Sequence, residues 1–516
     1  MTDVIVTTTT STGVILSGAV NRYFLAEGVT HYSTASDGTV FIDPAGSAVA
    51  LATDIFVNGT LANIASTVIQ QSNGSDAFNT TVTIGSSGRV MADPQLFAII
   101  LSTRGAFVVN NGEVSGAAAV SVIGDASRVH NNGVMVGSYA FSTNLFTVDF
   151  GGSNVEFVNT GTVLGRNGVE FNGNGSAVNS GTITATFTAI LSALSSSEAL
   201  DFSNTGTITG GTYVFEGRLG ADKVRNSGTL NGELDLDGGD NLLRNDGIIT
   251  GDVSAESGAD RIVNTGTING DLETGSGEDT VSITGTVAGN VDLGSNNDVL
   301  NMGSLGVVSG AVDGGFGDDS LYGGDLGDDL RGEEGADFIV GRAGDDTLSG
   351  GLGDDTVLGG SGADNLQGVA GSNVLNGQDG NDVLVAGIGN NRMFGGNGDD
   401  TLTANEGNDI LRGDAGNDVF VFQSVFDTGT GSTRDRILGW EDGADKIDLT
   451  GFGPVLTFSA TGPTGSGTGT VWFDAVSGGT QTMLRIDLDG DGTFDGQVLL
   501  VRADPALFDQ SDLILA

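Results

Sequence analysis

Acidic and amide side chains recur at every ninth residue in the second half of this 516-residue chain. From Gly314 to Val421 the sequence divides into twelve consecutive nine-residue units without an insertion, and the sixth residue of each unit is Asp or Asn. The block contains 21 acidic and 4 basic residues, so its own charge is −17 (4 − 21). Carboxylates held one strand apart repel each other, and calcium, a hard cation that takes oxygen ligands, removes that repulsion. The spacing therefore predicts several calcium ions in this block.

The predicted ligands are the sixth-position side chains and glycines at the first position of the units. The side chains are Asp319, Asp328, Asp337, Asp346, Asp355, Asp364, Asn373, Asp382, Asn391, Asp400, Asp409 and Asp418. The glycines are Gly314, Gly332, Gly341, Gly350, Gly359, Gly377 and Gly395. Asn373 and Asn391 keep an oxygen ligand but lose a charge, and Leu326 moves the fourth-position glycine of its unit to Gly327. We expect weak or empty sites at these turns.

A second acidic cluster lies near the end of the sequence. It consists of Asp487, Asp489, Asp491 and Asp495, and with Gly492 it matches the first half of an EF-hand-like calcium loop. The twelfth position of such a loop, which a bidentate Glu would occupy, is Val498. The segment therefore fits a bound cation and an acidic hairpin turn equally well.

Short strands must position the nine-residue units. The eighth residue is apolar in all twelve units, from Leu321 to Phe420. We expect the first six residues of a unit to form a turn rich in positive-φ glycine, and the last three to form a strand whose eighth side chain points into the core. Two units then make one 18-residue coil, so that units i and i+2 stack.

Units such as Gly341-Arg-Ala-Gly-Asp-Asp-Thr-Leu-Ser resemble the G-G-x-G-x-D-x-U-x repeat of the RTX (repeats-in-toxin) family of secreted proteins. The resemblance covers 108 residues. It implies a calcium-binding β-roll over residues 314–421, which stays extended where calcium is scarce and folds outside the cell, where calcium is near the millimolar range.

A looser repeat precedes the block and predicts a parallel β-helix over residues 51–313. Each repeat has an Asn turn followed by alternating β-forming residues, and these asparagines are Asn110, Asn131, Asn159, Asn179, Asn204, Asn226, Asn245 and Asn264. An Asn at a fixed place in every coil predicts a ladder of side-chain amides. From about residue 220 the coils also acquire aspartates, namely Asp222, Asp240, Asp260, Asp279 and Asp298. Because a 19-residue coil nearly matches an 18-residue one, we predict an all-β fold, a right-handed parallel β-solenoid that continues into the calcium-binding RTX β-roll.

The two ends are predicted to form separate segments. Residues 1–50 carry aromatic residues (Tyr23, Phe24, Tyr32 and Phe41) and suit a cap or an attachment segment. Residues 422–516 resemble the β-rich segment that follows RTX repeats in type I secreted proteins, in Asp435-Arg-Ile, Asp445-Lys-Ile-Asp-Leu and Asp512-Leu-Ile-Leu-Ala. That resemblance implies an uncleaved C-terminal signal, a type I exporter as partner, and a secreted or cell-surface protein of a Gram-negative bacterium. The start of the sequence, without a basic segment or an apolar run, fits this route.

Composition excludes several classes of function. The net charge of −47 disfavours nucleic acid and anionic membrane surfaces, and the short apolar stretches disfavour membrane insertion. The absence of cysteine excludes disulfide scaffolds and Cys-based zinc sites.

Catalysis is not expected. The sequence has no H-E-x-x-H and no G-x-S-x-G. Of its two histidines, His31 lies in the N-terminal segment and His130 directly precedes an Asn turn. A β-helix followed by an RTX roll is also the plan of secreted alginate epimerases, but their Asp-Pro-His-Glu phrase is absent, since Asp43-Pro44 continues with Ala-Gly. A chain of this charge would also repel a polyuronate.

Scarce lysine and methionine, no cysteine and abundant Thr, Gly and Ala resemble bacterial surface-layer proteins. We therefore predict a secreted calcium-binding structural protein that self-assembles into a homo-oligomer or polymer, as a surface layer or a matrix filament. One alternative is a calcium-dependent adhesin that binds a cell-surface polysaccharide or another cell. A second is a β-helix polysaccharide lyase or epimerase.

Overall fold

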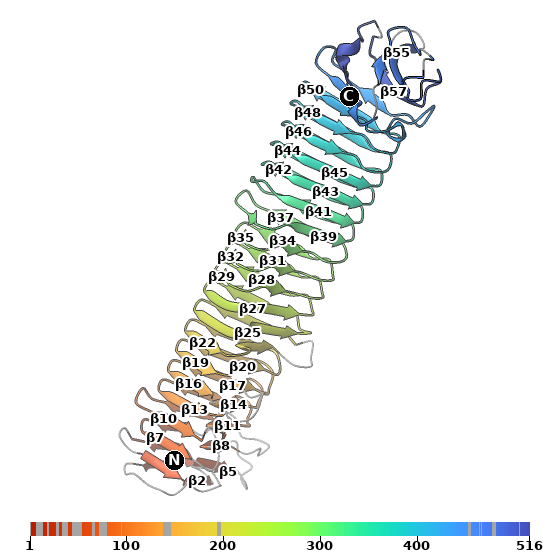
Figure 1. Cartoon of the computed structure of the whole chain (residues 1–516). Coiled ribbons are helices and arrows are strands. Elements are labelled where there is room, and N and C mark those ends of the chain that lie inside the picture. Colours follow the sequence, from red (N-terminus) through yellow and green to blue (C-terminus); the bar gives the residue numbers. More distant parts are fainter. Residues whose placement is uncertain are drawn as a thin grey trace. The chain divides into compact units, whose positions relative to one another are not determined.

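A computed structural model describes residues 2–6, 14–17, 20–26, 30–33, 40–43, 54–63, 68–71, 80–93, 95–137, 146–192, 198–452, 456–463, 465, 467–476, 481–504 and 506–516. The chain forms two compact units, Met1–Thr274 and Gly275–Ala516. Both consist of short strands, most of which pair in parallel with the strand one coil further along (Figure 1). The predicted all-β parallel solenoid is therefore confirmed. In the described part of the chain, no helix has the length and apolarity to cross a membrane.

Most coils of the first unit contain three strands, so three stacks run through it. The first stack is β1 (Thr2–Val6), β3 (Val20–Leu25), β6 (Asp54–Val57), β9 (Thr81–Ile84), β12 (Phe107–Asn110), β15 (Arg128–Asn131), β18 (Val155–Asn159), β21 (Gly175–Asn179), β24 (Leu200–Asn204), β26 (Lys223–Asn226), β28 (Leu242–Asn245) and β31 (Arg261–Asn264). The second is β4 (Thr30–Ser33), β7 (Thr60–Asn63), β10 (Arg89–Ala92), β13 (Glu113–Gly116), β16 (Val134–Gly137), β19 (Thr162–Gly165), β22 (Thr182–Ala185), β25 (Thr207–Arg218), β27 (Thr229–Asp237), β29 (Ile248–Ile249) and β32 (Thr267–Ile268). The third is β2 (Val14–Ser17), β5 (Val40–Asp43), β8 (Ile69–Gln71), β11 (Ile99–Leu101), β14 (Val120–Val122), β17 (Phe146–Phe150), β20 (Asn167–Phe171), β23 (Ile190–Ser192), parts of β25 and β27, β30 (Val253–Ser254) and β33 (Leu272–Glu273).

Residues 1–50 contribute strands to these stacks. Strand β3 pairs in parallel with β1 and β6, and Tyr23 on it is fully buried. The side chains of Phe24, Tyr32 and Phe41 lie outside the described residues, and the cap or attachment role of this segment stays a prediction.

Side chains in the first unit alternate between the core and the surface, as the period of a strand requires. Phe150 stacks on Phe171 one coil away, with ring centroids 5.1 Å apart, and Phe202 stacks on Phe215 within its own coil at 5.8 Å. The core is thus a column of apolar side chains between the stacks.

The predicted amide ladder is confirmed in the first stack. The Nδ2 of each repeat asparagine donates to the Oδ1 of the next, from Asn110 through Asn131, Asn159, Asn179, Asn204, Asn226 and Asn245 to Asn264, at 2.7–2.8 Å. All eight side chains are buried. An amide both donates and accepts, so this ladder is satisfied without any charge.

The second unit begins with three-strand coils and changes to two-strand coils. The three-strand coils are β34 (Thr280–Ile283), β35 (Thr286–Val287) and β36 (Val291–Asp292), then β37 (Val299–Met302), β38 (Val307–Val308) and β39 (Val312–Phe316). The two-strand coils are β40 (Ser320–Tyr322) and β41 (Asp329–Glu334), β42 (Phe338–Ala343) and β43 (Thr347–Leu352), β44 (Thr356–Ser361) and β45 (Asn365–Ala370), β46 (Val374–Asp379) and β47 (Val383–Val385), β48 (Arg392–Asn397) and β49 (Thr401–Thr403), and β50 (Ile410–Ala415) and β51 (Val419–Val421). The change falls beside Gly314, where the nine-residue period begins.

The rest of the second unit closes this roll. Strands β52 (Arg436–Leu438) and β53 (Lys446–Asp448) pair in parallel with β50 and β51 as one more coil. An antiparallel meander follows, made of β55 (Thr470–Val476), β56 (Gln481–Asp487) and β57 (Gly496–Val501), and β57 pairs with β52. The remaining elements are β54 (Thr457–Phe458), β58 (Leu513–Ile514) and the 3-10 helices η1 (Val425–Asp427), η2 (Thr450–Phe452) and η3 (Gln510–Asp512).

Replacing one amide of the ladder should destabilise the first unit. In Asn179→Ala the Nδ2 donor to Asn204 and the Oδ1 acceptor for Asn159 are both lost, and we expect a loss of about 1–3 kcal/mol in the free energy of unfolding. Urea unfolding followed by circular dichroism measures it. Asn172→Ala, which removes an exposed amide from the same coil, is the control, and equal losses in the two variants would contradict a stabilising ladder.

Candidate metal centre

The nine-residue units stack with a step of two, as predicted. Leu330 pairs with Leu348 and Leu348 with Leu366, each 18 residues further on, and all twelve eighth-position side chains are fully buried. The predicted division of a unit into six turn residues and three strand residues is wrong in one respect. Strand β42 runs through positions 7–9 of one unit and 1–3 of the next, because Arg342 and Ala343 continue the parallel pairing with Gly360 and Ser361. In strands β41–β46, β48 and β50, which extend in this way, only positions 4–6 turn, whereas β40, β47, β49 and β51 keep to positions 7–9 as predicted.

Every sixth-position side chain folds inward, and all except that of Asp328 accept a hydrogen bond from the previous coil. The backbone N–H of Asp319 donates to Oδ1 of Asp337 at 2.8 Å, and that of Asp337 donates to Oδ1 of Asp355 at 3.0 Å. The same bond links Asp328, Asp346, Asp364, Asp382, Asp400 and Asp418 on the other edge, and Asp355, Asn373, Asn391 and Asp409 on the first. We call this inter-coil series the carboxylate ladder.

The second carboxylate oxygen is buried without a hydrogen-bond partner in most rungs of the ladder. This holds for Oδ2 of Asp319, Asp337, Asp346, Asp355, Asp364, Asp382, Asp400, Asp409 and Asp418. Asp328 differs, because its Oδ2 accepts from the backbone N–H of Gly324 at 2.7 Å in the unit that Leu326 alters. A buried, unpartnered carboxylate oxygen is costly unless a cation or a proton compensates it.

The first-position glycines make room for these oxygens. A Cβ at Gly332, Gly341, Gly350, Gly359, Gly377 or Gly395 would collide with Oδ2 of the Asp five residues later, and one at Gly314 would lie 2.6 Å from Oδ2 of Asp319. The carbonyl oxygen of the first-position glycine one coil further on lies beside most of these places, as Gly332 does for Gly314 at 2.9 Å. The glycines thus leave a cradle lined by carboxylate and carbonyl oxygens.

Burial raises the pKa of the ladder carboxyls. The pKa of Asp337, Asp346 and Asp400 rises to about 7, chiefly because burial disfavours the charged form and further because neighbouring aspartates repel it. The pKa of Asp382 and Asp409 rises to about 6, again chiefly through burial. The ladder therefore holds its negative charge only with difficulty when no cation is bound.

Carboxylate and carbonyl oxygens in a cradle that a Cβ would fill are the donors that calcium prefers. The sixth-position aspartates and the first-position glycines of the ladder would hold the ions. A bound divalent cation would neutralise the repulsion between coils, so folding of the roll and ion binding are coupled.

The two asparagine rungs differ from the others. Nδ2 of Asn391 donates to the carbonyl oxygens of Gly387 and Gly389, at 3.3 and 3.1 Å, so this turn satisfies itself without an ion. Nδ2 of Asn373 is buried without a partner. The weak or empty sites expected at these two turns stay a prediction.

The ladder extends beyond the nine-residue block on both sides. Upstream, the N–H of Asp298 donates to Oδ1 of Asp319, and downstream the N–H groups of Asp409 and Asp418 donate to Oδ1 of Asp435 and Asp445. Asp435 and Asp445 were not predicted as site residues. Their signal is an apolar residue two positions later, Ile437 and Ile447, as in every unit of the block.

In the first unit, the proposed aspartate series needs one correction. Asp222 and Asp260 are buried, but Asp240 is exposed, and Asn241 takes the inward place, accepting from the N–H of Asp222 at 2.9 Å. Asp240 instead accepts from the N–H of Ala259 at the rim. The side chain that points inward is that of the residue directly before the strand, and in this coil that residue is Asn241 rather than Asp240.

The acidic loop of Asp487, Asp489 and Asp491 brings one oxygen of each residue within 4.8 Å of the others. It joins β56 to β57. Both carboxylate oxygens of the buried Asp487 accept backbone N–H groups, from Gly490 at 2.7 Å and Gly492 at 2.9 Å. Asp495 lies apart from the cluster and accepts from the N–H of Leu488. The loop is thus satisfied as an acidic turn, and its ion site stays a prediction.

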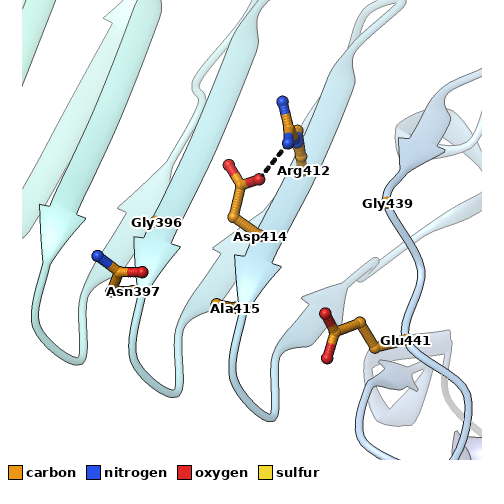
Figure 2. Close-up of a pocket in the computed structure, with 7 residues that line it drawn as sticks. All are labelled: Gly396, Asn397, Arg412, Asp414, Ala415, Gly439 and Glu441. Atoms are coloured by element: carbon orange, nitrogen blue, oxygen red, sulfur yellow. Dashed lines mark ion pairs between the residues drawn. The ribbon is translucent and has the colours of Figure 1, made fainter.

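A polar cleft of about 550 Å³ lies between the last coils of the roll and the loop after β52. Figure 2 shows its lining, in which Arg412 and Asp414 form an ion pair 2.5 Å long and Glu441 approaches from the loop. Asn397 adds an amide. This set contains an ion pair and an acid but no nucleophile beside a base, so it does not indicate a reaction.

Comparison with known proteins supports the calcium assignment. A family model described as the RTX calcium-binding nonapeptide repeat (4 copies) matches residues 322–357, 358–393 and 385–420. Residues 322–420 therefore carry RTX calcium-binding nonapeptide repeats, and they lie within a β-solenoid.

No curated protein matches the chain. Among solved structures, the AlgE6R2 subunit of a mannuronan C5-epimerase from Azotobacter vinelandii is 22% identical, with a TM-score of 0.22, over 38% of this chain and 92% of that chain. The AlgE6R3 subunit is 25% identical, with a TM-score of 0.19, over 35% and 79%. Neither likeness bears on the function of the whole chain.

Removal of calcium should unfold the roll. We expect chelation to abolish the β-sheet circular dichroism of residues 314–421 and millimolar calcium to restore it, because the buried carboxylates then regain their counter-ions. Asp355→Ala should weaken its own turn and the stacked neighbours. The exposed Asp354→Asn, which keeps the oxygen that accepts from the N–H of Ser372, should not. A dichroism spectrum unchanged by excess chelator would exclude the calcium ladder.

The calcium-depleted roll should become less stable as the pH rises. A carboxyl whose pKa is raised on folding binds its proton more tightly in the folded state than in the unfolded state. It therefore stabilises the fold fully at a pH below its pKa in the unfolded state. For Asp337, Asp346 and Asp400 this contribution to stability is lost as the pH rises past about 7. Calcium takes over from these protons as they leave, so the calcium concentration needed for folding should rise over the same range. Thermal melts of depleted protein that are identical at both ends of this range would contradict the burial of these carboxyls.

Proposed function

We propose that this protein is a secreted, calcium-binding extracellular structural protein that folds on meeting calcium and then self-assembles, as a surface layer or a matrix filament. The observation that carries the first step is the run of buried, unpartnered carboxylate oxygens in the ladder. Such a chain resists folding where calcium is scarce and folds where calcium reaches about 10⁻³ M, the range of weak extracellular sites. Residues 422–516 serve as the segment read by a type I exporter in this proposal.

The step from folding to assembly follows from charge. The ladder ions neutralise buried carboxylates, but exposed ones remain, such as Glu333, Glu334 and Asp379 on the strands of the roll and Asp354 and Asp399 on its turns. With a net charge of −47, two copies repel each other until cations screen or bridge them. Calcium shared between the acidic rims of two chains is the direct means of joining them.

We further propose that the protein acts without catalysis. His130 packs edge-on against Phe107, with ring centroids 4.8 Å apart, and its Nε2 lies 3.5 Å from Glu156 on the next coil. These contacts support a structural role in the stack. The side chain of His31 lies outside the described residues.

Assembly should depend on calcium and reverse on chelation. Light scattering and negative-stain electron microscopy across a calcium titration should show sheets or filaments that added chelator dissolves and that sodium chloride alone does not rebuild. Glu333→Gln combined with Glu334→Gln should raise the calcium needed for assembly without changing the circular dichroism, because both side chains are exposed. A particle that folds but stays monomeric at roughly 10 mM calcium, above the usual range of extracellular sites, would overturn self-assembly and favour the adhesin. Turnover of a polyuronate would favour the enzyme.

A further inference from the structure

Asp435 continues the carboxylate ladder past the last nine-residue unit, although it lies 26 residues after Asp409. Its Oδ1 accepts from the N–H of Asp409 at 2.6 Å, and Ile437 pairs with Leu411, an eighth-position residue. Asp435 therefore holds the sixth position of one more coil, whose turn is longer than any other in the roll. The matched repeats end at residue 420 and do not reach it.

The longer turn brings a third carboxyl group to this rung. Residues 422–435 contain helix η1, and Asp427 closes a capping box with Ser424 at its start. Asp427 is only 6% exposed, and its oxygens accept from the N–H groups of Gln423 and Ser424 at 2.9 and 3.0 Å and from Oγ of Ser424 at 2.9 Å. These bonds fix the carboxylate in place within the turn.

In two of the three carboxyl groups, one oxygen has no hydrogen-bond partner. The side chains of Asp409 and Asp435 are fully buried, and Oδ2 of each lacks a hydrogen-bond partner. Burial raises the pKa of Asp435 to about 9, and repulsion from Asp409 and Asp427 adds to the rise. Asp427 likewise contributes to the raised pKa of Asp409. The three groups therefore act on one another as a single buried cluster of negative charge.

We propose that Asp409 and Asp435, with the charge of Asp427 beside them, bind a hard cation such as calcium that closes the C-terminal end of the ladder. The inference rests on the proposed calcium-induced folding and adds a site outside the matched repeats. Asp409 and Asp435 offer the free carboxylate oxygens, which suit calcium or a lanthanide rather than a softer metal.

This ion would tie the C-terminal meander to the roll. The N–H of Leu499 on β57 donates to the carbonyl oxygen of Asp435 at 3.0 Å, and the N–H of Gln497 donates to that of Gly429, within the long turn, at 3.3 Å. Strand β57 pairs with β52 directly after Asp435. Docking of residues 422–516 therefore becomes calcium-dependent, although those residues contain no nine-residue unit.

The test uses the full chain with calcium as the probe. Asp435→Asn keeps an oxygen for the N–H of Asp409 but removes the charge, and Asp442→Asn removes an exposed charge from the same segment as a control. Trp440 packs against Phe420 with ring centroids 6.2 Å apart, so in a Trp472→Phe background its emission reports docking of the segment that follows the roll. Equilibrium dialysis counts the bound calcium.

We expect Asp435→Asn to bind one calcium ion fewer than Asp442→Asn and to need at least tenfold more calcium for the change in Trp440 emission. Asp427→Asn should weaken the same site while the circular dichroism of the roll persists, which separates ion loss from misfolding. Equal ion counts and equal midpoints in Asp435→Asn and Asp442→Asn would overturn the terminal site. If Asp355→Ala loses ions and Asp435→Asn does not, only this inference fails, whereas a wild-type chain that binds no calcium refutes the proposed function as well.

Discussion

A carboxylate folded into the interior of a coil has two oxygens, and the stack of coils can satisfy only one of them. In the roll, Oδ1 takes the backbone N–H of the previous coil, as between Asp337 and Asp319, while Oδ2 remains buried beside glycine. The charge on that second oxygen requires a cation or a proton. Stability of the whole roll is thereby linked to the composition of the solution, so that a rise in the calcium concentration favours folding.

In the first unit, the amide ladder satisfies the buried polar groups of successive coils without an ion. Each asparagine, such as Asn179, donates to the next coil and accepts from the previous one, so a column of buried polar groups closes on itself. Asn391 shows the same chemistry inside the roll, where its Nδ2 binds the turn carbonyls of Gly387 and Gly389. An Asn at an inward position therefore removes the buried negative charge that an Asp would need a cation or a proton to offset.

Because the roll is built from repeated coils, its dependence on a cation is distributed along the chain. Each coil contacts its neighbours only, so an ion at one rung stabilises the adjacent rungs and leaves distant ones unaffected. The terminal rung at Asp435 matters most for residues 422–516, because strand β57 pairs with the coil that this residue begins. A cation there would transmit folding from the repeats to a segment that has none.

The nine-residue period alone determined much of the structure: the parallel stacking, the buried eighth positions from Leu321 to Phe420 and the inward aspartates. The Asn turns likewise predicted the amide ladder, since one residue type at a fixed place in every coil must meet its own copy. Register along the coil was less accessible, because the spacing of the aspartates does not tell which residue points inward. The structure puts Asn241 rather than Asp240 at the inward position, and most strands of the roll extend into positions 1–3. Only the tertiary structure shows that Asp435 and Asp445 belong to the ladder. They follow the preceding rungs, Asp409 and Asp418, by 26 and 27 residues, and this spacing breaks the period. A fixed period in the sequence detects only coils whose loops have equal lengths. The hydrogen bond between coils, in contrast, forms with any residue that reaches the same position in space.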